Sequence, residues 1–238
     1  MHASWPRIDF VDRLSFFALL LAAAILAVVL LRYPSDPRHE RLGYIGLGLI
    51  CASAMLSLLL GNKRPFAGEG KRIGAWIGFA TGILWVIEIS FNNFVDPQIS
   101  TGRARFFVDN SFWAAIAFTM LIAALATSAR NTTIVSGIRV GLWSGYISGI
   151  IACLMALSLI LFGIRFLLRD PLNIAEYAAR APGASPAAMA SYFAYETIAG
   201  ALGHLFVLGI VMGLLLGLIG GVLGALFARI RSARPVTP

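Results

Sequence analysis

The sequence predicts an all-α fold: a polytopic helical membrane protein with six transmembrane helices that pack through glycine-rich faces. Three observations support this prediction. Of the 238 residues, 59% are hydrophobic and only 13% are charged, whereas charged residues make up about 25% of a typical soluble domain. Six apolar runs are long enough to cross about 30 Å of hydrocarbon. Glycine recurs at every fourth position in three separate apolar stretches.

The six predicted spans follow one another with short connectors up to the fifth span. Because a helix rises about 1.5 Å per residue, a run of about 20 apolar residues covers the hydrocarbon core. The first run is followed by Arg32-Tyr33-Pro34 rather than by a small-residue cleavage site, which indicates an uncleaved span. Together the runs predict a single integral membrane domain over residues 1–238. The spans lie at about 14–31, 43–61, 73–92, 111–128, 140–163 and 198–228.

The connector between the fifth and sixth spans, residues 164–197, is long enough to hold helices of its own. Asp170 followed by Pro171 predicts an N-cap and the first position of a short helix. Pro186 predicts the start of a second helix that runs into the sixth span as one extended or bent helix. We expect the short helix to be an extracytoplasmic interfacial helix between spans five and six. A gate or lid is the alternative.

The distribution of basic residues predicts the orientation. Six spans place both termini on one side, and that side carries 11 of the 19 basic residues, which favours cytoplasmic N and C termini. A composition rich in Arg, Ala and Gly is typical of a GC-rich bacterial genome, so we expect the cell inner membrane. The net charge of +8 comes from short clusters beside the apolar runs. Lipid headgroups account for these clusters, and nucleic acid is excluded as a partner.

Three sets of glycines predict how the helices pack. A four-residue step returns to nearly the same face of a helix, so each set leaves one face without side chains. In lipid, such faces allow helix backbones to touch, as in a glycine zipper. We expect the three faces to pack on one another within the chain, in the cytoplasmic half, with packing between two copies as the alternative. The sets are Gly74, Gly78, Gly82; Gly137, Gly141, Gly145, Gly149; and Gly209, Gly213, Gly217, Gly221.

Glu88 and Asn92 are the first half of a candidate ion, proton or polar site. A charge at the centre of a bilayer costs about 2.5–3.5 kcal/mol, so an ionisable residue inside a span is a functional candidate. Glu88 lies about 24 Å along the third span from Arg72, with Asn92 one helical turn further on. Its carboxyl either binds a proton or cation, or is bonded to Asn92 or to a neighbouring helix without a transport role.

Glu196 and His204 are the second half of the candidate site. His204 lies about 37 Å along the sixth span from Arg229, so we expect it nearer the outer boundary than Glu88. Glu196 lies on the same helix face about 12 Å further out. A single histidine at this depth is more typical of a hydrogen-bonded structural residue than of a metal ligand.

The sequence predicts no enzyme. It contains no P-loop, no HExxH and no GxGxxG at a strand–helix junction. We therefore expect no catalytic residues, and His and Cys spacing predicts neither a metal site nor a cofactor. The favoured hypothesis is a non-catalytic accessory or interaction subunit whose partners are the lipid bilayer and a membrane protein or a second copy. The alternative is a small permease or channel-like protein for an ion, proton or small solute, with Glu88 in the pathway. Inverted repeats, typical of many carriers, are not visible, which favours the first hypothesis.

Overall fold

The computed structural model of the chain describes residues 9–34, 37–60, 63, 67–95, 102–180 and 186–232. Within these ranges the structure is helical and contains no strand. The predicted all-α fold is confirmed for these residues, and six of the helices are long and apolar enough to cross a membrane, as a multi-pass protein requires. The elements are α1 (Phe10–Arg32), α2 (Pro37–Leu60), α3 (Glu69–Ser90), η1 (Phe91–Val95), α5 (Gly102–Asn131), α6 (Ile134–Leu167), α7 (Pro171–Arg180), α8 (Pro186–Leu202), η2 (Gly203–Val211) and α9 (Met212–Ser232).

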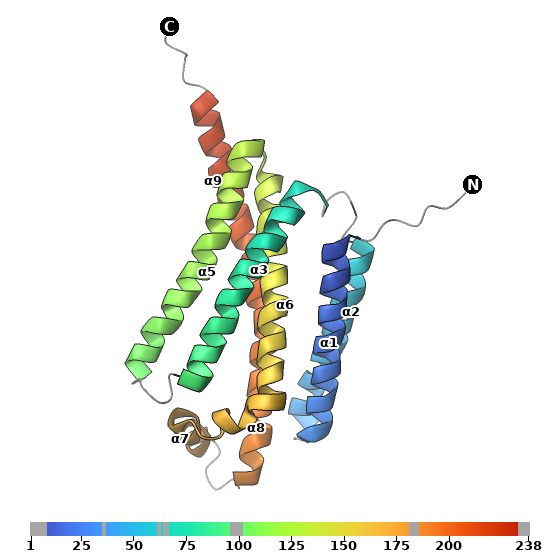
Figure 1. The fold of residues 1–238 in the computed structure, drawn as a ribbon, viewed down its shortest axis with the longest axis vertical. Coiled ribbons are helices and arrows are strands. Elements are labelled where there is room, and N and C mark those ends of the chain that lie inside the picture. Colours follow the sequence, from blue (N-terminus) through green and yellow to red (C-terminus); the bar gives the residue numbers. More distant parts are fainter. Residues whose placement is uncertain are drawn as a thin grey trace, which may run out of the picture.

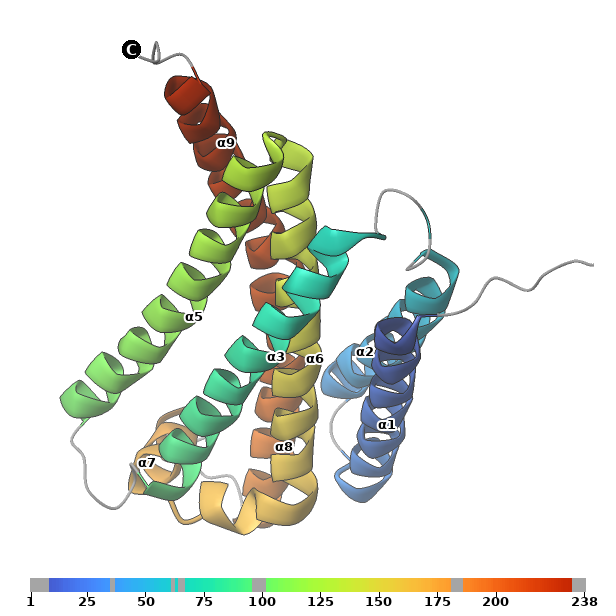
Figure 2. The same cartoon turned by 45° about the horizontal axis from the view of Figure 1, so that its top comes forward.

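Consecutive long helices run in opposite directions and pack around α6 (Figure 1). α6 contacts α1, α3, α5, α8, η2 and α9, and 56% of its apolar window is buried, the highest share among the six spans. Figure 2 shows α3 and α5 on one side of α6 and the α1–α2 hairpin on the other. α6 is therefore the helix on which both halves of the bundle are assembled.

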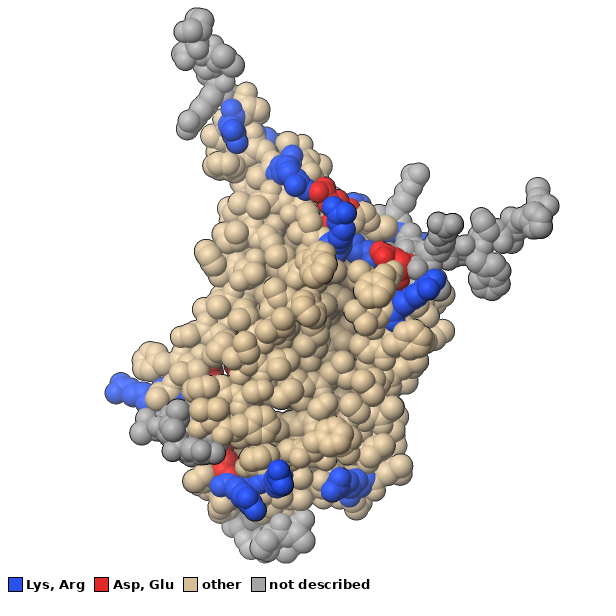
Figure 3. Space-filling model, in the orientation of Figure 1, with Lys and Arg blue, Asp and Glu red and all other residues tan. Residues whose placement is uncertain are grey.

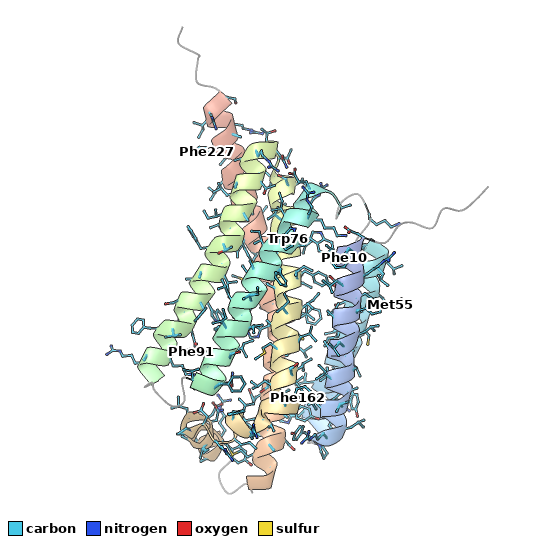
Figure 4. All side chains as sticks on the ribbon, in the orientation of Figure 1. Phe10, Met55, Trp76, Phe91, Phe162 and Phe227 are labelled. Carbon is cyan, nitrogen blue, oxygen red and sulfur yellow. The ribbon has the colours of Figure 1, made fainter. Side chains whose placement is uncertain are left out.

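The start of α1 and the end of α9 lie at the same end of the bundle, as an even number of spans requires. Phe10 and Phe227 mark this end in Figure 4, which we call the terminal end. Phe91 and Phe162 lie toward the opposite end, where α7 is found, and we call it the α7 end. In Figure 3 the basic side chains gather at the two ends of the visible face, with a mostly uncharged band between them.

The sixth span is one helix from Pro186 to Ser232, longer than the predicted run. Its hydrogen bonding changes from α-helical to π-helical over Gly203–Val211 and then returns to α-helical in α9. The helix thus joins the expected connector helix to the span without a break. Figure 1 shows that α9 also extends beyond the ends of α5 and α6.

Two apolar clusters fill the two sides of α6. One lies between α1, α2, α6 and α8, with Leu26, Ile50, Leu157 and Ile198 among its fully or almost fully buried members. The other joins α3, α5 and α6 through residues such as Trp85, Met120 and Leu159. The second cluster reaches the α7 end through Leu167 and Phe94.

The glycines of α6 face the glycines of η2 and α9 in antiparallel register. A Cβ atom added to Gly137 would lie 2.5 Å from Cα of Gly221, and one added to Gly213 would lie 2.8 Å from Cα of Gly145. Real Cβ contacts are essentially never this short, and the obstructing atoms are backbone. At these positions only glycine allows the observed approach of the two helices.

The glycines of α3 meet a different face of α6, and this differs from the predicted contact among three bare faces. A Cβ atom at Gly74 would lie 2.7 Å from the carbonyl oxygen of Val140, and one at Gly78 would lie 2.6 Å from that of Ser144. α6 turns its own glycine face toward η2 and α9, so it meets α3 with the face that carries Val140, Ser144 and Ile147, where both backbone and Cβ atoms lie close to the α3 glycines.

α9 has a second glycine face that the sequence analysis did not identify. Gly220 and Gly224 face α5, and a Cβ atom at Gly220 would lie 2.7 Å from the carbonyl oxygen of Leu121. Their four-residue spacing was a usable signal, although it stands out less than the longer set on the same helix.

Candidate functional site

Glu88 and Asn92 lie on the same face at the α7 end of the third span, as their four-residue spacing predicts. Nδ2 of Asn92 donates a hydrogen bond to Oε1 of Glu88 at 2.9 Å. Trp113 on α5 also lies beside the carboxyl and interacts with it. Because Glu88 is only 6% exposed, its carboxyl is bonded inside the helix packing and faces η1 and α5.

Arg105 on α5 extends this contact into a network. Its Nη2 donates to the carbonyl oxygen of Asn92 at 2.9 Å, and its Nη1 forms an ion pair with Oδ2 of Asp170 at 3.1 Å. Asp170 also caps α7, since its Oδ1 accepts the backbone N–H of Leu172 at 2.9 Å. The cap is the one that the Asp-Pro pair predicts. We call Glu88, Asn92, Arg105, Trp113 and Asp170 the α7-end polar cluster.

Two acceptor atoms beside this cluster have no partner among the described residues: Oδ1 of Asn92 and Oδ1 of Asp109. Asp109 and Arg105 both interact electrostatically with Glu88. A buried acceptor of this kind can take a hydrogen bond from an ordered water.

His204 lies against Trp85. Trp85 precedes Glu88 on α3 by about one helical turn. The two rings are perpendicular, with centroids 4.7 Å apart, and the opposite neighbour of Trp85 is Trp113 at 5.5 Å. Nδ1 of His204 is bonded to the carbonyl oxygen of Gly200 at 2.8 Å. No ion pair between Glu88 and His204 is present in the described chain, and the rings of Trp113 and Trp85 stand between the two residues.

The expected depth of His204 was wrong. The ring contacts Trp85, which precedes Glu88 on α3, so His204 does not lie nearer the α7 end than Glu88. The predicted depth was counted from Arg229 as if that residue lay at the membrane surface. α9 extends past the other helices at the terminal end (Figure 1), so the count began too far out. The π-helical turns of η2 also hold more residues than α-helical turns, which shortens the span.

Glu196 is not brought to the other candidate residues. Its side chain is exposed on α8, and the charge that it interacts with is Arg180 at the end of α7. The structure therefore joins Glu88 and Asn92, separates His204 from them by the rings of Trp113 and Trp85, and leaves Glu196 on the surface. Within the described ranges, no group of three or more His, Cys, Asp or Glu side chains is placed to hold a metal ion.

A buried ion pair at the terminal end was missed by the sequence analysis. Nζ of Lys71 on α3 lies 2.7 Å from Oδ1 of Asp12 and 3.1 Å from Oδ2 of Asp9. Asp12 is fully buried and Lys71 is 2% exposed. The ammonium also lies 4.8 Å from the ring centroid of Trp143, within cation–π range. An acidic residue near the start of the first apolar run was the available signal.

An open apolar groove lies between α2, α6 and η2, with a volume of about 150 Å³. Two of its hydroxyl groups are engaged within the chain: the Tyr146 hydroxyl donates to the Ser53 carbonyl oxygen at 3.3 Å, and Ser57 Oγ donates to the Ala54 carbonyl oxygen at 2.8 Å. The groove is distinct from the α7-end polar cluster. It is lined by Ser53, Leu56, Ser57, Leu60, Leu142, Trp143, Tyr146 and Ile210.

Comparison of the chain with protein-family models, with curated proteins and with solved structures finds no match. The functional conclusion therefore rests on the residues and geometry described above.

Proposed function

We propose that this protein is a non-catalytic accessory or interaction subunit of the membrane, which acts by binding another membrane component. The observation that carries the proposal is the position of Glu88. Its carboxyl accepts a hydrogen bond from Asn92, lies beside Trp113 and is buried within the packing of α3, η1 and α5. A carboxyl that couples transport must reach a polar route across the bilayer, whereas this one is held by partners from its own chain.

The other buried charges support the same proposal. Lys71 is paired with Asp12 and Asp9, and Arg105 is paired with Asp170. A buried charge that loses its partner destabilises a fold strongly, so paired charges at both ends serve to position helices. Enzymatic activity is not part of the proposal, because no catalytic motif occurs in the sequence.

The glycine faces are proposed to hold the bundle together within one chain. The register between α6 and α9 supports this role, because backbone meets backbone at successive helical turns. Close backbone approach improves van der Waals contact and allows Cα–H···O bonds, which stabilise helix pairs in lipid. Partners would then bind outside these faces, as another membrane protein or a second copy.

We further propose a bacterial inner membrane with the terminal end in the cytoplasm and α7 as an interfacial helix on the outer side. Basic residues are more numerous toward the terminal end, which favours this orientation. α7 exposes Leu172 and Ile174, buries Tyr177 and ends in Arg180. Exposed aliphatic residues followed by a basic residue are typical of helices that lie in the headgroup region.

The decisive experiment compares Glu88→Gln and Glu88→Leu with wild type in proteoliposomes. Pyranine reports proton flux and ion-selective dyes report cation flux, and thermal unfolding is followed in parallel. We expect no flux that depends on Glu88. Glu88→Leu should lose about 1–3 kcal/mol of stability, because the amide of Asn92 is left unpaired, whereas Gln can still accept its hydrogen bond.

Glu196→Gln is the matched control, because Glu196 is an exposed carboxylate at the same end of the bundle. It should leave stability within about 0.5 kcal/mol of wild type. A proton or cation flux that disappears in Glu88→Gln while the fold persists would overturn the proposal and establish the permease alternative.

A further inference from the structure

We infer that the groove between α2, α6 and η2 binds one acyl chain of an anionic phospholipid, whose headgroup lies at the terminal end near Lys63. This inference does not depend on the proposed function, because a permease could bind the same lipid.

The medium outside the groove is hydrocarbon. Ser53, Leu56 and Ser57 lie inside the second candidate span, and Leu142 and Tyr146 lie inside the fifth. The groove is open toward the surroundings of the bundle rather than enclosed by it. In a bilayer its contents are therefore drawn from lipid chains or from a neighbouring protein.

The lining is mostly apolar and offers a water molecule few hydrogen-bond partners. Each polar oxygen named above is bonded within the chain, so a water would find few free partners. Apolar cavities of about this volume stay dry and take up small apolar molecules. A segment of an acyl chain has the required chemistry and shape.

The charge at the terminal end selects an anionic headgroup. Leu60 closes the groove on α2, and the backbone N–H of Lys63 donates to the carbonyl oxygen of Leu60 at 2.8 Å. Lys63 is exposed and follows Leu60 by three residues, so its long side chain can reach a headgroup at this end of the groove. Exposed Arg13 and Arg72 belong to helix ends at the same side of the bundle. A basic residue near a membrane surface contributes about 1 kcal/mol of attraction to anionic lipid.

Native mass spectrometry of the full chain in mild detergent tests the inference with phosphatidylglycerol and phosphatidylethanolamine as probes. We expect a monomer that retains one phosphatidylglycerol after delipidation. Ser53→Phe fills the groove from α2 and should abolish this retained lipid, and Ile210→Phe should do the same from η2.

Leu59→Phe is the matched control for the groove. Leu59 is 61% exposed on α2 and does not line the groove, so the substitution adds the same ring outside it. The retained lipid should persist in this variant. Thermal unfolding verifies that each variant is folded, and the Ile210 variant keeps the test open if the Ser53 variant fails to fold.

Lys63→Gln tests the headgroup. It should reduce the preference for phosphatidylglycerol over phosphatidylethanolamine about fivefold, because the loss of about 1 kcal/mol corresponds to that factor. Equal retention of lipid in Ser53→Phe, Ile210→Phe and Leu59→Phe would overturn the inference. A lipid-free dimer that Ser53→Phe converts to monomer would also overturn it, since a second copy would then fill the groove.

Discussion

Nζ of Lys71 lies 2.7 Å from Oδ1 of Asp12, and this ion pair joins the start of α3 to the start of α1 across 59 residues of sequence. Asp12 has 0% and Lys71 3% of its side chain exposed. The pair is therefore a buried connection between the α1–α2 hairpin and the rest of the bundle.

Lys71→Met is expected to destabilise the protein by about 3–5 kcal/mol, because it leaves the carboxylate of Asp12 buried without its partner. The double variant Asp12→Asn, Lys71→Met should recover most of this loss. Thermal unfolding in detergent measures both. Arg130→Gln is the control, since Arg130 pairs with Glu69 on the surface, and it should cost no more than about 1 kcal/mol. Similar losses in Lys71→Met and Arg130→Gln would contradict a buried connection.

Gly145→Ala and Gly48→Ala are expected to change stability in opposite directions. A Cβ atom at Gly145 would lie 2.8 Å from Cα of Gly213. A Cβ atom at Gly48 would lie more than 4 Å from every described atom outside its own stretch of α2. The first substitution should cost about 1–3 kcal/mol through overpacking. The second should stabilise α2 by about 0.5–1 kcal/mol, because alanine restricts the unfolded chain. The measurement is again thermal unfolding, and a neutral Gly145→Ala would show that the two backbones are not in contact.

Asp170→Ala and Asp170→Asn separate two roles of one side chain. Asn retains an oxygen that can cap α7 but removes the charge that pairs with Arg105, whereas Ala removes both. We expect Ala to be less stable than Asn by about 1 kcal/mol, the usual value of an N-cap. Equal unfolding temperatures for the two variants would mean that the cap does not contribute.

Single cysteines at the two ends test the proposed orientation. In a background of Cys51→Ala and Cys153→Ala, we expect a membrane-impermeant maleimide to label Arg180→Cys from outside the cell and Ser232→Cys only after the membrane is opened. The reverse pattern would mean that the orientation is opposite to the proposed one. Labelling of both cysteines from outside would contradict a single membrane crossing between residues 180 and 232.

Local sequence signals were sufficient for the contact between Glu88 and Asn92 and for the cap of α7 by Asp170. Both depend on residues within one helical turn, where spacing alone determines which side chains meet. The same reasoning placed Glu196 and His204 on one helix, but it could not show that Glu196 lies on the surface while His204 packs on Trp85. That outcome depends on which helix stands beside the sixth span.

The glycine sets illustrate the same division. Four-residue spacing predicts a bare face on each helix, but it does not say which faces meet. In the structure α6 meets α9 glycine to glycine, the glycines of α3 meet a face of α6 without glycines, and Gly220 and Gly224 form a further face toward α5.

Run length and periodicity are properties of a continuous segment, and for that reason the number of apolar helices and their approximate bounds follow from the chain alone. The pairing of Asp12 with Lys71, the depth of His204 and the groove beside Tyr146 arise between segments far apart in sequence. They were decided by tertiary packing, because close contact in a bilayer depends on the fit of whole helix faces and on a buried charge finding its partner.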